Sequence, residues 1–457
     1  MSSNDLPEMM ADRPLRFGKR SVTGCDYFDY NPDQPNLFMM MKFKHLLVQE
    51  HGLEEGFGLY KQTIVRQQDA ALERRKLESH YSYSVAHSVE FHEIFPAGEP
   101  ITIMPPEVIG KGNHRPLNST TRSFYVTCLV DARVRGRSAV TEVSELALAD
   151  FQGQELARID DDVEFDSGVF HRGSDKLWLI SDARPALKLD QAFSLLGART
   201  DFFGDWLCDY ILRYVAATMS GHVPRVPVLI DMGMPPTHRQ ALEVMLIPDT
   251  EIIEVPAFRG VEVKRLWQAP SISYMPFHQK LNEKWKWDYN ACSPERSLLV
   301  EDEMVRRVNL LLGPGAGPSR VFLARKAFRH RKMTNHREIE AIAAAHGFVI
   351  SYPEDLDFVS QAKLLRDARF VLGPEGSAFF LCSFVGRGAK ICILNHQETE
   401  GLVLYNGVFD LKEIHLTVIT GPDTGDHHRR QQDKNYTIDA EAFRRFLDEW
   451  CGPPVQT

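Results

Sequence analysis

A regular alternation of short apolar runs and amphipathic stretches in the last third of the chain constrains the fold more than any other feature. The apolar runs, which predict strands, lie at 320–324, 348–351, 370–372 and 390–394. The amphipathic stretches, which predict helices, lie at 336–346, 357–368 and 377–385. Strands that alternate with helices in this way form a parallel sheet with helices on its faces. This part of the chain is therefore predicted to be a Rossmann-like α/β unit.

A second alternation of the same kind lies upstream. Helices and strands are predicted in turn at 202–219, 227–233, 238–246 and 250–256. Between residues 123 and 180 the pattern instead has period two, with Gly and Asp at the turns, which predicts a small antiparallel sheet. The predicted fold class is therefore α/β, with two Rossmann-like domains and a small antiparallel β extension.

These patterns divide the chain into four predicted parts. They are a partly helical N-terminal extension at 1–119, a small antiparallel β region at 120–185, a first Rossmann-like domain at 186–300 and a second one at 301–457. Within the extension, residues 37–82 have a helical pattern. Residues 270–300 are rich in Trp and Pro, and we expect them to be irregular and to cross between the two domains.

Composition limits the class of protein. A chain of 457 residues with 43% hydrophobic and 25% charged side chains is long enough for two or three domains with full-sized cores. The net charge of −9 argues against a general nucleic-acid-binding protein. The seven cysteines lie far apart and include no CxxC pair, which favours free thiols in a reducing compartment. Because no apolar run approaches the ~20 residues of a membrane span and the first residues do not resemble a signal peptide, we expect a cytoplasmic protein.

Cationic side chains gather where the first predicted strand of the second domain ends. Arg325, Arg329, Arg331 and Lys332 lie between this strand and the next helix. Ligands of α/β sheets bind at the carboxyl ends of strands, and arginine binds phosphate oxygens through paired N–H groups. The loop is therefore a candidate diphosphate site. A solvated surface loop without a ligand is the alternative.

A Gly-rich turn, GPEGS at 373–377, follows another predicted strand. Gly376 lets the backbone approach a ligand closely, and Ser377 is placed to cap the following helix, whose N-terminus favours phosphate. The carboxylate of Glu375 would repel a diphosphate, so we expect it to accept hydrogen bonds from two ribose hydroxyls. A plain strand–turn–helix corner is the alternative.

Further polar residues have both a structural and a functional interpretation. Asn335, three residues before Glu338, has the spacing of a helix capping box. Asp357 is placed to cap the next helix, and Gln361, one turn later, faces either solvent or a ligand. Both interpretations stay open for Asn335 and Gln361.

Three carboxylates, Asp201, Asp205 and Asp209, recur every four residues at the start of the helix at 202–219. Aligned carboxylates repel one another, so such a row can hold a base of raised pKa, or it can be the solvated face of a surface helix. Upstream, the HSVEFHE segment at 87–93 contains possible metal ligands. Its histidines are five residues apart, which does not match the spacing of a helical metal pair, and we predict no metal site.

Residues 325–384 resemble glycosyltransferase family 61. The resemblance rests on a strand that ends in Arg, a basic loop, an Asn-x-x-Glu helix start, Gly-Phe before a strand, Pro-Glu, a Gln-containing helix, an Ala and a Gly-rich turn. Here these elements read Phe322-Leu-Ala-Arg325, Arg331-Lys332, Asn335-x-x-Glu338, Gly347-Phe348, Pro353-Glu354, Gln361, Ala368 and Gly373-Pro-Glu-Gly-Ser377. Upstream, Phe202-Phe-Gly-Asp-Trp206 resembles the Asn-(Tyr/Phe)-x-His-Trp helix start of the family.

The chain departs from the family pattern at three positions. Glu375 stands where the family has a His in its Gly-rich turn, and Asp205 stands where the family has a His before Trp. A later Asn of the family falls on Leu381. These are the positions that bear on the donor preference and on the identity of the base. Counted from the antiparallel region onward, the resemblance covers about residues 120–450.

The resemblance implies a function and a site. It implies two Rossmann-like domains facing a cleft (the GT-B arrangement) and inverting transfer from a nucleotide-sugar, usually a UDP-sugar, without an essential metal or other cofactor. Residues 186–300 would form the acceptor side and residues 301–457 the donor side. Asp205 and Asp209 are the candidate catalytic residues, and Trp206 is either a sugar platform or a core residue. The candidate donor-binding residues are Arg325, Arg331, Lys332, Asn335, Gln361, Glu375, Gly376 and Ser377.

We expect the partners to be a nucleotide-sugar and a glycan, lipid-linked saccharide or other polysaccharide precursor of bacterial type. Peripheral contact with a membrane and a homo-oligomer are compatible with the sequence, and nucleic acid is not expected. Two alternatives stay open. One is a nucleotide-sugar-binding protein without catalysis. The other is nucleic-acid binding through the basic loop at 325–337, which the net charge of −9 disfavours.

Overall fold

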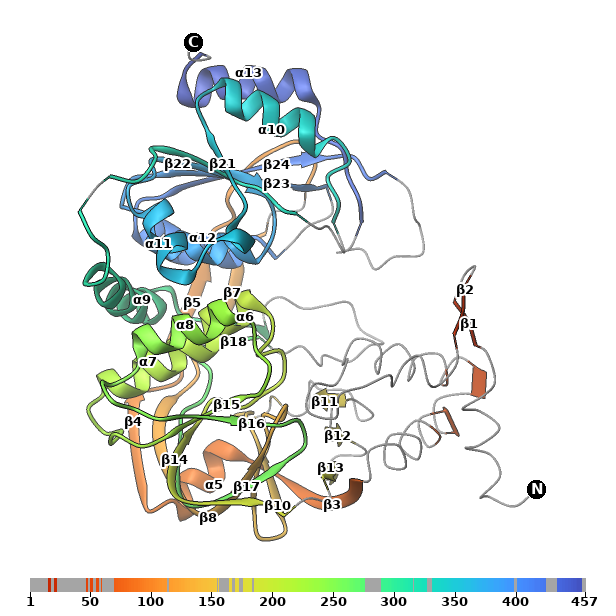
Figure 1. Cartoon of the computed structure of the whole chain (residues 1–457), viewed down its shortest axis with the longest axis vertical. Helices are drawn as coiled ribbons and strands as arrows, with labels where there is room; N and C mark the ends of the chain where they lie inside the picture. The colour runs from red at the N-terminus through yellow and green to blue at the C-terminus, as the bar shows by residue number, and fades with distance from the viewer. Residues whose placement is uncertain are drawn as a thin grey trace.

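The computed structural model describes most of the chain from residue 70 onward. Undescribed within 70–453 are residues 113–114, 154, 156–163, 167–168, 172–175, 183–184, 276–288, 315, 327–330, 398–400 and 425–433. Before residue 70, only 15–17, 20–22, 47, 50–51, 55–56 and 59 are described. Two sheets organise the described residues, one above the other along the long axis of the molecule (Figure 1).

The sheet nearer the C-terminus has six strands, and every neighbouring pair is parallel. Its order is β21 (Val349–Ser351), β20 (Arg320–Leu323), β22 (Phe370–Pro374), β23 (Lys390–His396), β24 (His415–Gly421) and β6 (Glu107–Ile109). The chain enters the sheet at β20, adds β21 on one side of it, and then adds β22, β23 and β24 in turn on the other side. This is the order of a doubly wound sheet. The edge strand β6 comes from the region predicted to be an N-terminal extension, so that region is not separate from the second Rossmann-like unit.

Helices cover both faces of this sheet. On one face α10 (His336–Ala345) and α13 (Ala440–Cys451) pack on a core that includes Leu372 and Leu394. On the other face lie α11 (Phe358–Arg366), η5 (Ser377–Phe384) and α12 (Val403–Leu411). The chain therefore leaves β20 toward one face and β22 toward the other. Where the connections of two neighbouring strands leave toward opposite faces, a crevice forms at the carboxyl ends of the strands. Doubly wound sheets bind their ligands in this crevice.

The sequence predicted four of these six strands, β20 to β23, and missed β24 and β6. Asp357 caps α11 as expected, because its Oδ1 accepts a hydrogen bond from the Ser360 amide at 2.8 Å. Residues 377–384, which were predicted to be helical, form a 3₁₀-helix. Its buried residues pair at a spacing of three, Phe379 with Cys382 and Leu381 with Phe384. A spacing of three matches the three residues per turn of a 3₁₀-helix. The buried residues do not form the apolar stripe of period 3.6 that an α-helix would present.

The other sheet has twelve strands and is mixed. Its order is β11 (Glu164–Asp166), β12 (Val169–His171), β13 (Lys176–Asp182), β3 (Ala70–Ser79), β10 (Leu146–Ala149), β9 (Thr141–Val143), β8 (Phe124–Arg135), β17 (Gly260–Gln268), β14 (Leu187–Ser194), β15 (Val228–Asp231) and β16 (Ile252–Val255), with β4 (Glu90–Phe95) beside β8. Strands β17, β14, β15 and β16 are parallel neighbours. The antiparallel strands predicted at 123–180 therefore continue the sheet of the first α/β unit.

Two predictions upstream of the second unit were wrong. Residues 70–79 have the composition of a helix, yet they form β3, which pairs antiparallel with β13 and parallel with β10. Sheet pairing overrides the weak intrinsic preference here. Residues 294–309, expected to lie partly in an irregular crossing, form helix α9, which Ser293 caps by accepting from the Arg296 amide.

The remaining helices lie on the twelve-stranded sheet, the lower one in Figure 1. They are α5 (His80–His87), α8 (Pro236–Met245) and one continuous helix made of α6 (Phe203–Asp205), the π-helical segment η2 (Trp206–Ile211) and α7 (Leu212–Met219). The other short elements are η4 (Pro353–Asp355) and three two-stranded pairs, β1 (Leu15–Phe17) with β2 (Arg20–Val22), β5 (Pro100–Ile103) with β7 (Leu117–Thr120), and β18 (Ser273–Tyr274) with β19 (Ala291–Cys292).

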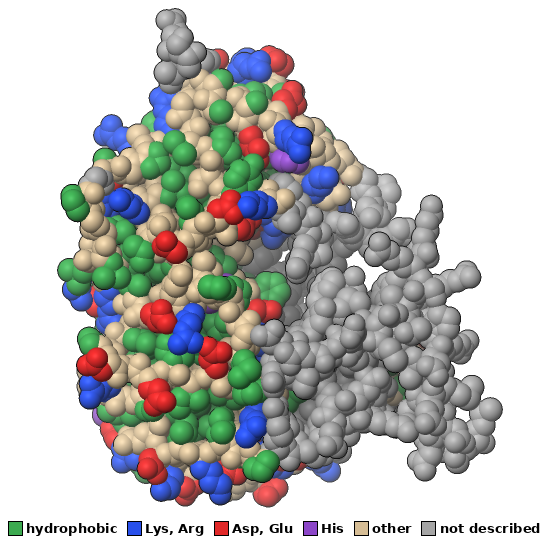
Figure 2. Space-filling view, in the orientation of Figure 1, with side chains coloured by type: hydrophobic (Ala, Val, Ile, Leu, Met, Phe, Trp, Pro, Cys, Tyr) green, Lys and Arg blue, Asp and Glu red, His purple; other side chains and the backbone are tan. Residues whose placement is uncertain are grey.

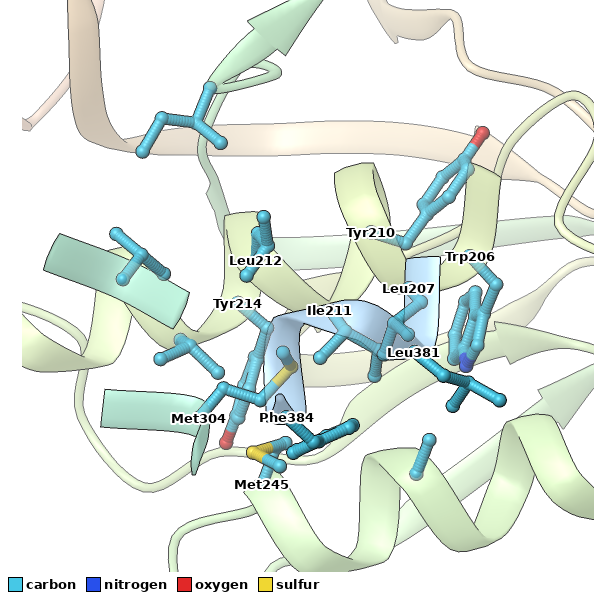
Figure 3. Packing of buried hydrophobic residues seen from close by; sticks show 14 of the residues in the cluster. Trp206, Leu207, Tyr210, Ile211, Leu212, Tyr214, Met245, Met304, Leu381 and Phe384 are labelled. Atoms are coloured by element: carbon cyan, nitrogen blue, oxygen red, sulfur yellow. The ribbon is translucent and has the colours of Figure 1, made fainter. Parts of the chain in front are cut away.

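One hydrophobic core joins the two halves of the molecule. Leu381 and Phe384 of η5 lie beside Leu207 and Ile211 of η2, and Met245 of α8 lies next to them (Figure 3). Because apolar burial is worth about 25 cal/mol per Å², a shared core of this kind fixes the position of η5 against the long helix. In the described part of the chain, no helix is long and apolar enough to cross a membrane.

Candidate functional site

The predicted basic residue and the Gly-rich turn meet at the carboxyl ends of β20 and β22. Arg325, just after β20, donates from Nη1 to the carbonyl oxygen of Glu375, just after β22, at 3.0 Å. Its guanidinium lies over Gly376, where an added Cβ would be 3.5 Å from Arg325 Cζ. The sequence therefore placed Arg325, Glu375, Gly376 and Ser377 correctly on one edge of the sheet, at the point where the strand order reverses.

Gly373 explains how closely these two strands approach. A Cβ at this position would lie 2.4 Å from the carbonyl oxygen of Leu323, a distance that side chains do not tolerate. The glycine thus lets the end of β22 lie against the end of β20. As a result, the backbone of the turn at 373–377 reaches the Arg325 side chain.

Arg331 brings a second cation to the same place. Its backbone has a left-handed φ of 55°, and its guanidinium pairs with the Glu375 carboxylate. Burial, together with the neighbouring charge of Arg331, lowers the pKa of Arg325, although an arginine stays protonated in proteins. Two guanidiniums thus meet at one residue, Arg331 at the carboxylate of Glu375 and Arg325 at its backbone carbonyl. An anion that enters would relieve their mutual repulsion, so the site favours negatively charged ligands.

Glu375 does not stand free for a ribose. Arg331 already engages its carboxylate, and only 11% of the side chain is exposed. A ribose hydroxyl would have to share the carboxylate with that arginine. The proposed ribose contact therefore stays a prediction. Arg331 would compete with the ribose for the Glu375 carboxylate, and the sequence did not predict that pairing.

The other predicted donor-binding residues have structural contacts. Lys332 is exposed, and its backbone amide donates to Asn435 Oδ1 at 3.1 Å. The Asn335 side chain does not cap α10. Its Nδ2 donates to the Ile438 carbonyl at 2.8 Å, and its Oδ1 accepts from the Ile438 amide at 3.2 Å. Asn335 thus ties the start of α10 to the segment before α13. Arg329 lies outside the described residues.

Gln361 and Ser377 also differ from the expectation. Gln361 is buried and donates from Nε2 to the carbonyls of Pro353 and Leu356, at 2.8 and 3.3 Å, so it holds η4 against α11. Ser377 is the first residue of η5 and makes no capping hydrogen bond, and Gly376 occupies the cap position. The exposed side chain of Ser377 instead faces the other half of the molecule.

That facing element is α6. A Cβ on Gly204 would lie 2.6 Å from Phe380 Cε2 and 3.3 Å from Ser377 Oγ. Only a glycine permits this approach, and it brings the start of the long helix directly against the Gly-rich turn. The segment that resembles the family's helix start is therefore adjacent to the candidate anion site.

Asp205 follows Gly204 by one residue. Its Oδ2 accepts from Arg199 Nε at 3.0 Å, and its side chain is 21% exposed. Burial raises the pKa of Asp205, while Arg199 opposes that rise. A partly buried carboxylate of raised pKa beside an anion site has the properties of a general base.

The rest of the acidic row is paired as well. Asp209 accepts two hydrogen bonds from Arg213 Nη2, at 2.8 and 2.9 Å, and Asp201 lies 3.3 Å from Arg137 Nη1. The three carboxylates therefore do not form one solvated face, although the charges of Asp209 and Asp201 add to the rise in the pKa of Asp205. Each has its own arginine, and of the three only Asp205 directly follows Gly204, the residue that touches the Gly-rich turn.

Trp206 is a core residue. Its side chain is fully buried, and its Nε1 donates to the His238 carbonyl at 2.8 Å. It cannot serve as a platform for a sugar in this conformation. Burial lowers the pKa of His238 to about 4, so the imidazole that stacks beside Trp206 is neutral at pH 7.

Sequence reasoning missed several polar groups near the same edge. Asn395 and His396 end β23 and are buried, and His396 Nδ1 lies 3.9 Å from Asp423 Oδ1. Tyr436 donates from its hydroxyl to the Leu394 carbonyl at 2.8 Å. The criterion that selected Arg325, a polar residue just after an apolar strand, would also have selected Asn395 and His396 in the run ILNH.

Tyr405 of α12 is another missed neighbour. Burial raises the pKa of its hydroxyl well above the usual value, and the carboxylate of Glu375 adds to the rise. Its ring packs on Phe380, with ring centroids 5.0 Å apart. The hydroxyl is therefore a neutral hydrogen-bond donor close to Glu375. No periodicity or motif pointed to it.

Two other predictions concern ions and nucleic acid. Across the described residues, no group of three or more His, Cys, Asp or Glu side chains is placed to hold a metal ion. In the HSVEFHE segment, Glu93 accepts instead from Ser123 Oγ, and the His92 ring stacks on His222 at 3.7 Å. On the face shown in Figure 2, Lys and Arg side chains are interspersed with Asp and Glu, with no broad basic patch for nucleic acid.

Comparison with known proteins identifies one region. Residues 203–392 match the family described as Glycosyltransferase 61. The matched range begins with α6 and ends within β23, so it contains Gly204, Asp205 and the whole Arg325–Glu375 edge. No curated protein matches the sequence.

Proposed function

We propose that this glycosyltransferase, whose residues 203–392 match glycosyltransferase family 61, transfers a sugar with inversion from a UDP-sugar to a hydroxyl acceptor. The observation that carries this proposal is the pair of guanidiniums, Arg325 and Arg331, beside the Gly-rich turn where β20 and β22 diverge. This is the position at which doubly wound sheets bind phosphorylated ligands.

The donor's diphosphate would occupy the space next to Arg325 and Arg331. As the sugar departs, negative charge grows on the diphosphate, and preorganised cations stabilise that charge without reorganising. Arginine suits this task because its planar N–H groups contact two phosphate oxygens at once. In this proposal no metal ion is needed to neutralise the leaving group. Lys332, which is exposed, adds a further positive charge at the rim.

Asp205 would act as the general base. The acceptor hydroxyl oxygen forms a bond to the anomeric carbon of the donor sugar while the bond from that carbon to the diphosphate breaks. The hydroxyl proton passes to the Asp205 carboxylate, and UDP leaves. Attack from the side opposite the leaving group inverts the anomeric configuration. Asp209, whose carboxylate is bound by both of its oxygens to Arg213, is the weaker candidate for this role.

The two sheets support a GT-B arrangement, with the donor on the six-stranded sheet and the acceptor on the side of α6. The contact of Gly204 with Phe380 and Ser377 brings the two sides together. We propose a glycan or a lipid-linked saccharide, of the kind used in bacterial polysaccharide synthesis, as the acceptor and the cytoplasm as the compartment.

A nucleotide-sugar-binding protein without catalysis is a second candidate. One observation favours it: Asp205 and Glu375, which replace two histidines of the family pattern, are both engaged by arginines. A binding protein of this kind would bind UDP but would not turn over any donor.

The donor site is tested by titrating UDP into the wild-type protein and into Arg325→Ala by calorimetry, in EDTA. Arg325→Lys, which keeps the charge but loses the paired N–H groups, is the companion variant. Arg387→Ala is the matched control, because this exposed arginine pairs with Glu413 and lies just before the start of β23. It is therefore at the amino-terminal ends of the strands, away from the carboxyl ends where Arg325 lies.

We expect UDP to bind the wild-type and Arg387→Ala proteins equally. Arg325→Ala should weaken binding by about 10- to 100-fold, in line with about 1.5–3 kcal/mol for a hydrogen bond to a charged group. UDP binding that is equal in all variants would remove Arg325 from the donor site. No UDP binding at all would contradict the proposed donor.

A further inference from the structure

Phe202 is an unusual aromatic residue in this fold. Its side chain is 52% exposed, whereas no other Phe or Trp whose exposure is described is exposed. It directly precedes α6, and its carbonyl accepts the Trp206 amide at 2.9 Å. The ring therefore stands at the start of the long helix and faces solvent.

Arg199 holds one face of this ring. The guanidinium carbon lies 5.0 Å from the ring centroid, within cation–π range. The same guanidinium donates to Asp205 Oδ2 at 3.0 Å. Arg199 has a left-handed φ of 64°, which a residue with a side chain adopts only when the surroundings require it. This backbone conformation places one side chain against both the exposed ring and the candidate base.

The ring also lies close to the place where the two halves meet. Gly204, two residues after Phe202, lies against Ser377 of the Gly-rich turn and against Phe380 of η5. Two helical residues advance only about 3 Å along a helix. An acceptor that contacts the ring would therefore lie beside Asp205 and within reach of a donor bound at Arg325.

A flat apolar ring, open on one face and next to a base, suits a sugar. Pyranose rings present C–H groups on one face and hydroxyls at the edge, so they stack on aromatic rings while their hydroxyls stay free for hydrogen bonds. A lipid chain or an extended peptide would need a longer apolar groove or an exposed strand edge. Here a single aromatic ring stands out among the exposed side chains of the helix start.

We infer that the acceptor is a saccharide whose pyranose ring stacks on Phe202 and directs its hydroxyl to Asp205, with Arg199 as the residue that positions both. This inference rests on the proposed function, which it deepens by naming the residues that would bind and position the acceptor sugar. Phe202 contacts the sugar, and Arg199 acts through its neighbours.

The test uses saturation-transfer NMR on the full-length protein with UDP present. The probes are the methyl pyranosides of glucose, galactose, mannose, xylose and N-acetylglucosamine. The variants are Phe202→Ala, Phe202→Leu, which is apolar without an aromatic face, and Phe202→Trp. Met219→Ala is the matched control, because it removes an exposed apolar side chain from the other end of the same helix. UDP binding by each variant is measured in parallel.

At least one pyranoside should bind to the wild-type, Phe202→Trp and Met219→Ala proteins. Phe202→Ala and Phe202→Leu, which remove the aromatic face, should weaken that binding about tenfold, which corresponds to about 1.4 kcal/mol. In a transfer assay the same two variants should raise the acceptor KM by about the same factor and change kcat less. Arg199→Ala should change the pH profile of kcat as well, which loss of the platform alone would not do.

The inference is overturned if UDP binds but no pyranoside does, or if Phe202→Leu binds pyranosides as the wild type does. If UDP fails to bind while the pyranosides still bind through Phe202, the proposed donor is wrong and the acceptor inference stands. The failure of the inference and the failure of the proposed function therefore give different results.

Discussion

Replacement of Gly204 by alanine tests the contact between the two halves of the site. The added Cβ would lie 2.6 Å and 2.8 Å from two carbons of the Phe380 ring and 3.3 Å from Ser377 Oγ. Carbon atoms pack at about 3.5–4.0 Å, so the ring would have to retreat by about 1 Å. It has little room for this, because Tyr405 lies on it with ring centroids 5.0 Å apart.

Two opposing effects set the magnitude. Alanine is favoured over glycine inside a helix by about 0.8–1.0 kcal/mol. Overpacking costs about 1–3 kcal/mol, and a contact as short as this one belongs near the upper limit. We therefore expect Gly204→Ala to lower the free energy of unfolding by about 1–2 kcal/mol. Since a misplacement of 1 Å in an active site can cost 100-fold, kcat/KM should fall by about 10²-fold.

Thermal unfolding and donor turnover measure these two effects. Gly313→Ala is the control, because a Cβ there meets no atom within 4 Å. In the double variant Gly204→Ala with Phe380→Leu, the smaller side chain makes room, so the two substitutions should be less harmful together than the sum of their separate effects. A Gly204→Ala protein with wild-type stability and activity would refute the close contact.

Three other substitutions have distinct expected outcomes. Asp205→Asn should lower kcat by about 10²–10⁴-fold and leave UDP binding unchanged; in the wild type, the rate should rise with pH through the raised pKa of this carboxyl, and a fully active variant would exclude it as the base. Glu375→Gln should strengthen pyrophosphate binding about threefold or more, because it frees Arg331, and weaken uridine binding; equal weakening of both ligands in calorimetry would exclude the ribose role. Burial raises the pKa of Glu301 in α9 to about 7, above its unfolded value of 4.5. Between these two pH values the native state holds a proton that the unfolded chain has lost. The stability of the wild type should therefore fall as pH rises from about 4.5 to 7. Urea titrations of Glu301→Gln should lose this component, on the order of 1–3 kcal/mol, and an unchanged pH dependence would contradict it.

The sequence predicted best the four strands β20 to β23 of the six-stranded sheet. These strands are short apolar runs between helices with clear periodicity, and local signals such as the Asp357 cap agree with the global fold. Prediction was poorest where tertiary contacts decide the structure. Residues 70–79 are strand β3 because β10 and β13 pair with them. Likewise, β6 joins the second unit from more than 200 residues upstream, and no local pattern can reveal such a partner.

The candidate site divides in the same way. Arg325 and Gly376 could be found because both directly follow strands whose carboxyl ends meet at one edge. The pairing of Glu375 with Arg331, of Asp205 with Arg199 and of Asp209 with Arg213 could not, because these contacts depend on side-chain positions and on left-handed backbones at Arg199 and Arg331. Tyr405 comes under the influence of the Glu375 charge only through the position of α12 in the fold.

The most direct test of the central claim is the anomeric configuration of the first product. The protein would be incubated with the α-linked donors UDP-glucose, UDP-galactose, UDP-xylose and UDP-N-acetylglucosamine, together with the pyranoside acceptors, and the anomeric protons would be followed by NMR from the first minutes. The account predicts that a β-linked product forms with release of UDP, and that both signals are lost in Asp205→Asn. An α-linked product, or UDP that binds without turnover of any donor, would contradict it.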